Sequence, residues 1–489
     1  MSLLARRTLI AASLLALAWG ALAFGAVYPW AYVPLGIACA VIGAVALVTY
    51  RPLHAPVRPF TIAIGSITLV IALQLVPLPL PWLAKVSPGT DRFLRSYDLS
   101  YSIGRTSESP DDSVSHRPAH PISIAPERTG RGLALFGAFA LFTLGLTAAL
   151  SVHGAVPLVR GVVALGVVLA LIGIIQYAVT GGATYTLKIY GFWTPQYRGS
   201  PFGPFINRNH FAGWMLMALP VAVTSAISAA SSFRGGGVRA FVAWVSASRQ
   251  AGLMHLMAGA SVIMALSVLI ANSRSGLLGF FMSAVLATGL VMRRQRSRRG
   301  RVASVLLALA LLFGIVTWAG VGGLASRVAT VGRADSSAGG RIQAWRGALA
   351  ITADFPLLGS GLDTFGVAML QYQTGDRSIH FEEAHNDYLQ ILAEGGAALG
   401  AAVVAAIATV AWLVHARFRE APREGTTYWA RTGAVIGMLS IAVQSLMEFS
   451  LQMPGNAALF CLLVAIALHR SPNLRVRPSA GQSNYGFDR

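Results

Sequence analysis

Long apolar runs occupy most of the chain, and shorter segments rich in polar residues, proline or arginine separate them. Most runs contain about 17 residues or more, which as an α-helix is enough to cross a hydrocarbon core about 30 Å thick. The pattern predicts an all-α polytopic membrane protein with about twelve transmembrane helices. The predicted spans are residues 8–24, 31–50, 60–77, 131–152, 160–180, 211–231, 252–271, 276–292, 302–320, 387–413, 432–450 and 457–469.

Composition agrees with this prediction, because 55% of the residues are hydrophobic and only 11% are charged. The formal net charge is +20, and almost all of the positive charge comes from arginine. Most arginines fall in the connections that lie on the same side of the membrane as the N-terminus in the predicted topology. This positive-inside bias predicts cytoplasmic termini and makes arginines such as Arg417 and Arg431 topology determinants that also contact anionic lipid. The basic runs are split among short loops without interleaved aromatic residues, which argues against nucleic acid as a partner.

Three segments outside the predicted spans are long enough to carry function. The predicted organisation of the chain has five parts. They are residues 1–130 (spans 1–3 and a first outer loop), 131–320 (spans 4–9), 321–386 (a large outer loop), 387–470 (the last three spans) and 471–489 (a cytoplasmic tail). The first outer loop, after residue 77, is rich in proline, and its centre near residues 106–119 is predicted to be flexible.

The second segment, residues 181–210, alternates aromatic residues with basic and amide side chains and ends in FINRNHFAGW. Aromatic faces beside hydrogen-bonding groups suit a sugar-binding surface, whereas an aromatic belt at the membrane interface explains the same composition equally well. On the first interpretation, Arg208, Asn209 and His210 would contact the donor or acceptor sugar.

The third segment contains a predicted amphipathic helix at residues 336–354, with Arg341, Trp345 and Leu349 at four-residue spacing on one face. The glycine-rich turn LLGSGLDTF follows. A mobile helix flanked by glycines at the membrane surface is a candidate lid.

His385 and Asn386 follow this turn, where the polar loop meets the apolar run that begins at residue 387. Histidine is the side chain whose unperturbed pKa lies closest to neutrality, so it suits proton transfer. The simpler alternative is a helix-start residue that only caps its own backbone.

Arg274, in ANSRSGLLGF, lies where only a tight turn separates two apolar runs. An arginine there is expensive unless it is paired or functional, although snorkelling from a helix end also accounts for it. Glu448, near the outer end of the eleventh predicted span, is similarly out of place and could pair with an arginine.

The sequence gives no sign of a metal site or a cofactor. Asp335, Asp354 and Asp363 are scattered, Glu382 and Glu383 are adjacent rather than spaced by one helical turn, and the two cysteines fall in separate apolar runs.

Several motifs occur in an order that resembles the O-antigen ligase and polymerase superfamily. They are SRSG, then GRIQAW, DFPLLGSGLDTF and HNDYLQILAEGG, and the stretches QLVPLPLPWLAKVSP and NRNHFAGW resemble the polymerases of that group. In one departure from the ligase pattern, the glycines Gly396 and Gly400 are four residues apart rather than three.

The resemblance implies a GT-C-like, metal-independent, inverting glycosyltransferase of the bacterial inner membrane, with a periplasmic active site containing amphipathic loop helices. His385 matches the essential histidine of the family, and Arg274 and Arg341 match its two important arginines. The expected partners are an undecaprenyl-diphosphate-linked glycan, an acceptor glycan or lipid A-core, membrane lipid and other polysaccharide-assembly proteins. The predicted substrate-binding residues are Asn386, Arg208, Asn209, His210, Trp345, Tyr388 and Glu448.

A polymerase, which joins lipid-linked repeat units, is favoured over a ligase that acts on lipid A-core, because the first outer loop and the NRNH stretch resemble polymerases. A transporter or flippase of lipid-linked sugars would need polar groups near mid-span, and Gln176 and Gln444 are the best candidates. A non-catalytic scaffold would not require His385 and two arginines on one face.

Overall fold

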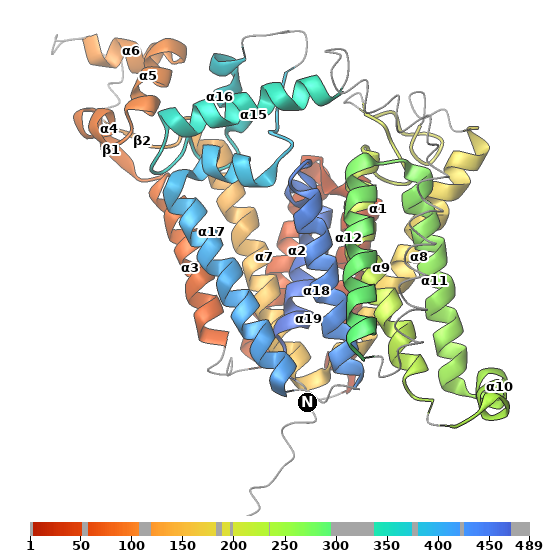
Figure 1. The fold of residues 1–489 in the computed structure, drawn as a ribbon. Helices are drawn as coiled ribbons and strands as arrows, with labels where there is room; N and C mark the ends of the chain where they lie inside the picture. The colour runs from red at the N-terminus through yellow and green to blue at the C-terminus, as the bar shows by residue number, and fades with distance from the viewer. Residues whose placement is uncertain are drawn as a thin grey trace, which may run out of the picture.

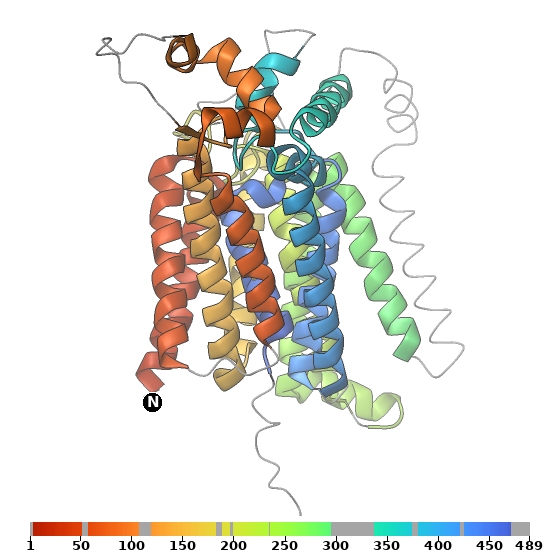
Figure 2. The same cartoon turned by 90° about the vertical axis from the view of Figure 1, so that its left-hand side faces the viewer.

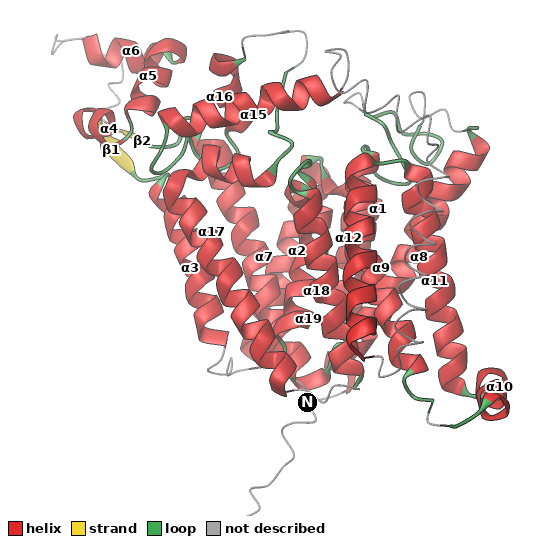
Figure 3. Ribbon diagram, viewed as in Figure 1, coloured by secondary structure: helices red, strands yellow, loops and turns green. Residues whose placement is uncertain are grey.

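The structure is a computed structural model that describes residues 3–50, 57–106, 119–181, 188–195, 199–233, 235–294, 337–373, 380–420 and 425–470. Most of this part of the chain is helical (Figure 3), which confirms the predicted all-α fold. Each predicted span corresponds to one long helix, except residues 302–320, which lie outside the described residues. The long helices are α1 (Leu3–Leu22), α2 (Pro29–Thr49), α3 (Arg58–Leu73), α7 (Pro126–His153), α8 (Val156–Val179), α9 (Arg208–Ala230), α11 (Arg249–Ala271), α12 (Arg274–Arg294), α17 (Asp387–Glu420), α18 (Thr426–Gln444) and α19 (Pro454–Leu468).

These helices stand roughly side by side in one bundle (Figure 1). Seven of them are long and apolar enough to cross a membrane by length and composition, namely all except α3, α12, α18 and α19. Among the seven, α9 is the most buried, because α8, α11, α12 and α18 surround it. The chain is therefore a multi-pass membrane protein with a closely packed centre.

Glycine allows α2 and α7 to cross at close range. A Cβ on Gly43 would lie only 2.3 Å from the carbonyl carbon of Leu141, and one on Gly145 would lie 2.3 Å from the carbonyl oxygen of Gly43. Small residues at such crossings let backbones approach and gain van der Waals contact, which drives helix association in lipid. By contrast, α3 lies at the edge of the bundle beside α17 and exposes Ile62 and Leu69.

A layer of short elements covers the end of the bundle opposite the N-terminus, and we call this end the capped end (Figure 2). The first part of the layer is α4 (Leu80–Val86), α5 (Pro88–Tyr97) and α6 (Leu99–Thr106), with strands β1 (Pro77–Pro79) and β2 (Ala119–Pro121) paired antiparallel. The prolines that predicted a loop instead start helices, since proline lies in the first turn of α4, α5 and α7. The predicted flexible centre lies largely outside the described residues.

The rest of the layer is α15 (Ser337–Asp354), which lies across the bundle (Figure 1), and α16 (Phe365–Tyr372). The predicted helix is confirmed, but the face that it buries is formed by Ala344, Ala348 and Ile351, while Leu349 is 57% exposed. Small side chains let α15 lie close to the helices beneath it. The remaining short elements are η1 (Phe24–Ala26), α10 (Val238–Ala247) at the N-terminal end, and η4 (Ser450–Gln452).

The turn after α15 docks into a break in α17. At Gly396, φ is 59° and ψ is −164°, so the helix opens there. The amides of Ala397 and Ala398 donate to the carbonyls of Pro356 and Leu357, and the amide of Gly361 donates back to the carbonyl of Glu394. The turn that follows the candidate lid helix is thus bonded to α17 on both sides of the break.

Two arginines at the N-terminal end cap helix carbonyls. Arg431 is 1% exposed and donates to the carbonyls of Ala467, Arg417 and His469, while Arg417 donates to that of Leu468 and pairs with Glu420. The last turn of a helix has unsatisfied carbonyls, and cations there are favourable. These two arginines therefore fix the end of α19, a role beyond that of topology determinants in contact with lipid.

Candidate active site

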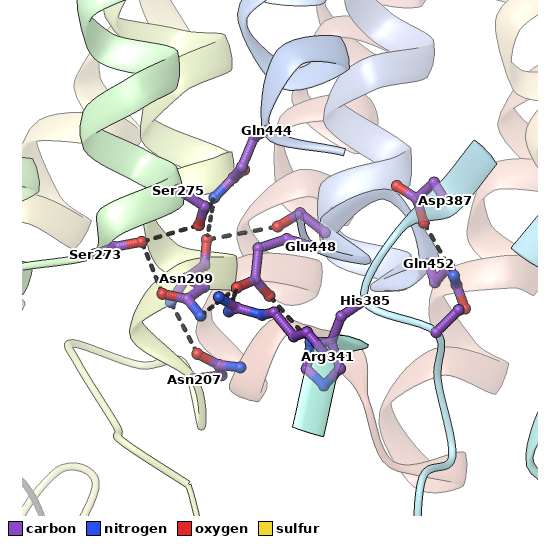
Figure 4. A network of polar contacts seen from close by, with 12 residues as sticks. Asn207, Asn209, Ser273, Ser275, Arg341, His385, Asp387, Gln444, Glu448 and Gln452 are labelled. Atoms are coloured by element: carbon purple, nitrogen blue, oxygen red, sulfur yellow. Dashed lines mark hydrogen bonds and ion pairs between the residues drawn. The ribbon is translucent and has the colours of Figure 1, made fainter. Parts of the chain in front are cut away.

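The sequence-predicted residues converge at the capped end around Glu448, which follows α18 (Figure 4). Its side chain is completely buried. One carboxylate oxygen, Oε1, accepts hydrogen bonds from Arg341 on α15 and from the Nδ2 of Asn209, 2.6 Å away on α9. A buried carboxylate needs such partners, because an unpaired charge out of water is strongly unfavourable.

His385 approaches the other oxygen of Glu448. Its Nδ1 lies 3.5 Å from Oε2, too far for a hydrogen bond, and neither atom has a hydrogen-bond partner among the described residues. The imidazole packs edge-on against Phe449, with the ring centroids 4.8 Å apart, and is 29% exposed. Since Nδ1 itself is buried, the exposed part of the ring lies elsewhere on it.

Helix capping by Asn386 holds His385 just outside α17. The Oδ1 of Asn386 accepts hydrogen bonds from the amides of Tyr388 and Leu389, and His385 has a left-handed φ of 52°. Such a φ is unusual for a residue with a Cβ and is found at sites that the surroundings impose. The capping role therefore belongs to Asn386 and leaves the imidazole free for other contacts.

Asn209 ties three helices to the site. Its side-chain Oδ1 accepts a hydrogen bond from the hydroxyl of Ser273 at 2.7 Å. Its backbone carbonyl accepts a hydrogen bond from the side-chain amide of Gln444 at 2.9 Å. Asn207 caps α9 by accepting from the amide of Asn209. The sequence made Gln444 a candidate for a transport pathway, and here it is hydrogen-bonded within this network. The 3.4 Å contact of its Nε2 with the Ser275 hydroxyl joins α18 to α12.

The other predicted residues lie around this centre at different depths. Arg274 begins α12, between Ser273 and Ser275, and its exposed side chain forms no ion pair with any described residue. His210 is 5% exposed and packs edge-on against Phe449, the same ring that His385 contacts, with the centroids 4.7 Å apart, so it is buried rather than at a surface. Trp345 is half-buried, and Tyr388 donates to the carbonyl of Ala442.

Arg208 starts α9, and its backbone amide donates to Ser200. The sequence analysis did not predict three residues of the site, namely Phe449, Ser273 and Asn207. Nothing in the sequence marks an aromatic, hydroxyl or amide residue at a helix end as part of a site. Their proximity in sequence to Glu448, Arg274 and Asn209 was the one available signal.

A second polar cluster lies beside His385, along the start of α17. The amide of Gln390 donates to the carboxylates of both Glu383 and Glu394, and Gln452 donates to Asp387. Burial, and then the nearby charge of Glu394, raise the pKa of the Glu383 carboxyl well above its usual value. No group of three potential metal ligands occurs in the described part of the chain.

The aromatic residues of the second outer segment form a separate cluster at the ends of α1 and α2. Phe24 and Trp193 stack with centroids 4.9 Å apart, and Tyr190 donates to the carbonyl of Leu22. Phe192 is 70% exposed. The cluster fixes the segment to the bundle, and both interpretations of its composition stay open.

Comparison with known proteins gave a family match for a segment that contributes to this site. A comparison with curated proteins gave no match. Residues 259–404 match the family model described as O-antigen ligase, and they include Arg274, Arg341 and His385. This match agrees with the resemblance of the sequence motifs to the O-antigen ligase and polymerase superfamily.

Proposed function

We propose that the protein is a membrane glycosyltransferase that transfers a glycan from undecaprenyl diphosphate to a sugar hydroxyl in the periplasm. The observation that carries the proposal is the convergence of His385 and Arg341 on the buried Glu448 at the capped end. These residues come from segments far apart in sequence, and two of them lie in the O-antigen ligase domain.

In this mechanism the acceptor oxygen attacks the anomeric carbon of the donor. His385 takes the hydroxyl proton, the bond from the anomeric carbon to the diphosphate oxygen breaks, and undecaprenyl diphosphate leaves with the electron pair. Attack from the side opposite the leaving group inverts the configuration. A positioned base of this kind contributes about 10²–10⁴-fold.

Arginine supplies the countercharge for the leaving group. The guanidinium plane presents paired donors that match phosphate oxygens, and fixed donors stabilise charge that develops as the bond breaks. Arg274 has an exposed side chain and no ion-pair partner among the described residues, which leaves its guanidinium available to bind the diphosphate. Arg341 is 21% exposed and would reach the same group from α15.

The location in the bacterial inner membrane follows from the same proposal. The N-terminal end of the bundle carries the connections richest in arginine, which suits a cytoplasmic face. The capped end would then face the periplasm. The undecaprenyl tail of the donor would remain in the bilayer beside the helices.

Polymerase is the favoured form of this activity, with a second lipid-linked repeat unit as acceptor and O-antigen or exopolysaccharide as product. The resemblance of the first outer segment to polymerases supports it, and that segment forms the ordered helices α4–α6 over the capped end. The alternatives are a ligase that glycosylates lipid A-core and a transporter of lipid-linked sugars.

Reconstitution of the purified protein with an undecaprenyl-diphosphate oligosaccharide, in the presence of EDTA, tests the proposal. Product length on a gel is compared for wild type, His385→Ala and the control His380→Ala, which removes an exposed histidine of the same loop. A ladder from donor alone, lost only in His385→Ala, supports a metal-independent polymerase. Product only on added lipid A-core supports a ligase, and movement of intact lipid without transfer refutes the enzyme.

A further inference from the structure

Glu448 is shared between two groups with different tasks in the proposed reaction. Its Oε1 holds Arg341, which would bind the donor diphosphate, and its Oε2 faces His385, which would take the acceptor proton. We infer that Glu448 is a positioning residue that couples the two steps: it pairs with Arg341 until the donor diphosphate takes that arginine, and then orients His385. The inference rests on the proposed function.

The gap between Glu448 and His385 shows that the second contact is incomplete in this structure. Oε2 and Nδ1 are both buried, lack a hydrogen-bond partner among the described residues, and lie 3.5 Å apart. A hydrogen bond between them needs a separation of about 2.7–3.2 Å, so a shift of a few tenths of an ångström would complete it. Two unsatisfied buried atoms favour that shift, because each alone is costly.

The completed hydrogen bond would prepare His385 for its role. With Nδ1–H donating to Glu448, the neutral imidazole carries its lone pair on Nε2, the nitrogen that is left to accept the proton of the acceptor hydroxyl. The carboxylate would also stabilise the imidazolium that forms, as in other histidine–carboxylate pairs. The opposite tautomer would place the Nδ1 lone pair against a carboxylate oxygen, which is repulsive.

Arg341 determines when the hydrogen bond between His385 and Glu448 forms. While its guanidinium contacts Oε1, the charge of Glu448 is already balanced, and the carboxylate has less to gain from His385. A diphosphate offers several negative oxygens and competes for the same guanidinium. Once Arg341 turns to the diphosphate, the buried carboxylate keeps only the amide of Asn209, 2.6 Å from Oε1, and its strongest remaining partner is His385.

Two variants separate this role from a merely structural one. Glu448→Gln retains an acceptor for Arg341 but removes the charge. We expect it to bind undecaprenyl diphosphate at least as tightly as wild type, since Arg341 is released from its competing carboxylate, and to lower turnover by about 100-fold. Glu448→Asp keeps the charge but is shorter by one methylene, so it should retain donor affinity within about threefold and lose at least tenfold in turnover. Glu382→Gln, which removes an exposed carboxylate from the loop that carries His385, should leave both unchanged.

The spectroscopic test follows the imidazole itself. The ¹⁵N spectrum of histidine-labelled protein, assigned by the signals that disappear in His385→Gln, reports which ring nitrogen carries hydrogen. Undecaprenyl diphosphate should shift wild-type His385 towards the Nδ1–H form and leave Glu448→Gln unchanged. An unchanged tautomer in wild type with the lipid bound, or loss of donor affinity in both Glu448 variants, overturns the coupling. Failure of wild type to bind undecaprenyl diphosphate refutes the proposed function instead, because binding is measured without turnover.

Discussion

Replacing Gly396 by alanine should detach the turn after α15 from α17. Its φ and ψ of 59° and −164° fall in a region that is open essentially to glycine alone. In addition, a Cβ at this position would lie 2.5 Å from the carbonyl carbon of Leu357 and 2.7 Å from the amide nitrogen of Gly359. Both neighbours are backbone atoms, so the clash cannot be relieved by rotating a side chain.

The size of the effect follows from the contacts at stake. Backbone strain of this kind costs about 1–3 kcal/mol. Four backbone hydrogen bonds join the turn to α17, from Ser360, Gly361, Ala397 and Ala398, and losing two of them at about 1 kcal/mol each brings the total to about 3–5 kcal/mol. Because each 1.4 kcal/mol is a tenfold change in an equilibrium constant, local opening should become roughly 100- to 5,000-fold more frequent.

Hydrogen exchange measured by mass spectrometry in detergent can detect this change. Peptides that cover residues 357–362 and 393–398 should exchange faster by that factor, under conditions where exchange reports the opening equilibrium. Gly400→Ala is the matched control, since its Cβ would meet only the flexible end of Leu392, at 2.8 Å. Unchanged exchange in Gly396→Ala, or an equal effect in Gly400→Ala, would refute the reasoning.

Three further predictions concern single side chains. His385→Ala should lower the transfer rate by about 10²–10⁴-fold at saturating donor, while His380→Ala stays near the wild-type rate, and equal rates in both would exclude His385 as the base. The raised pKa of Glu383 means that the folded protein binds its proton more tightly, so stability present below the usual carboxyl value of 4.5 is lost as the pH rises through the raised pKa. The thermal midpoint should therefore fall less with pH in Glu383→Gln, and parallel curves would contradict this. Arg431→Lys should lower the free energy of unfolding by about 2–4 kcal/mol through lost contacts with backbone carbonyls, measured by denaturant titration. Arg419→Lys, at an exposed position, should leave it unchanged. Unchanged stability in both variants would leave topology as the only role of Arg431.

Hydropathy was enough to predict the bundle, because an apolar run of sufficient length has few stable conformations in a bilayer other than a helix. The same logic fails for the short elements over the capped end. Pro88 marks a helix start as readily as a loop, and only packing against residues distant in sequence, such as Asp354 beside Gly89, decides between them.

The candidate site was predicted residue by residue but not as an arrangement. Arg341 and His385 stand out because charged or titratable groups are rare beside apolar helices. Their shared contact with Glu448 joins positions up to 107 residues apart, and no local pattern encodes it. Asn386 shows the opposite case, since its capping contacts are local and the capping interpretation for the HN pair was available from sequence alone.

The shortness of α3 has a consequence for the surrounding lipid. Its 16 residues rise only about 24 Å as a helix, less than the roughly 30 Å of an average hydrocarbon core. Because α3 stands at the edge and exposes Ile62 and Leu69, lipid tails must match its length directly. The bilayer should therefore be thinner along this flank, at a cost of a fraction of a kcal/mol per ångström of mismatch, and the headgroups there would lie closer to the mid-plane than around the longer helices.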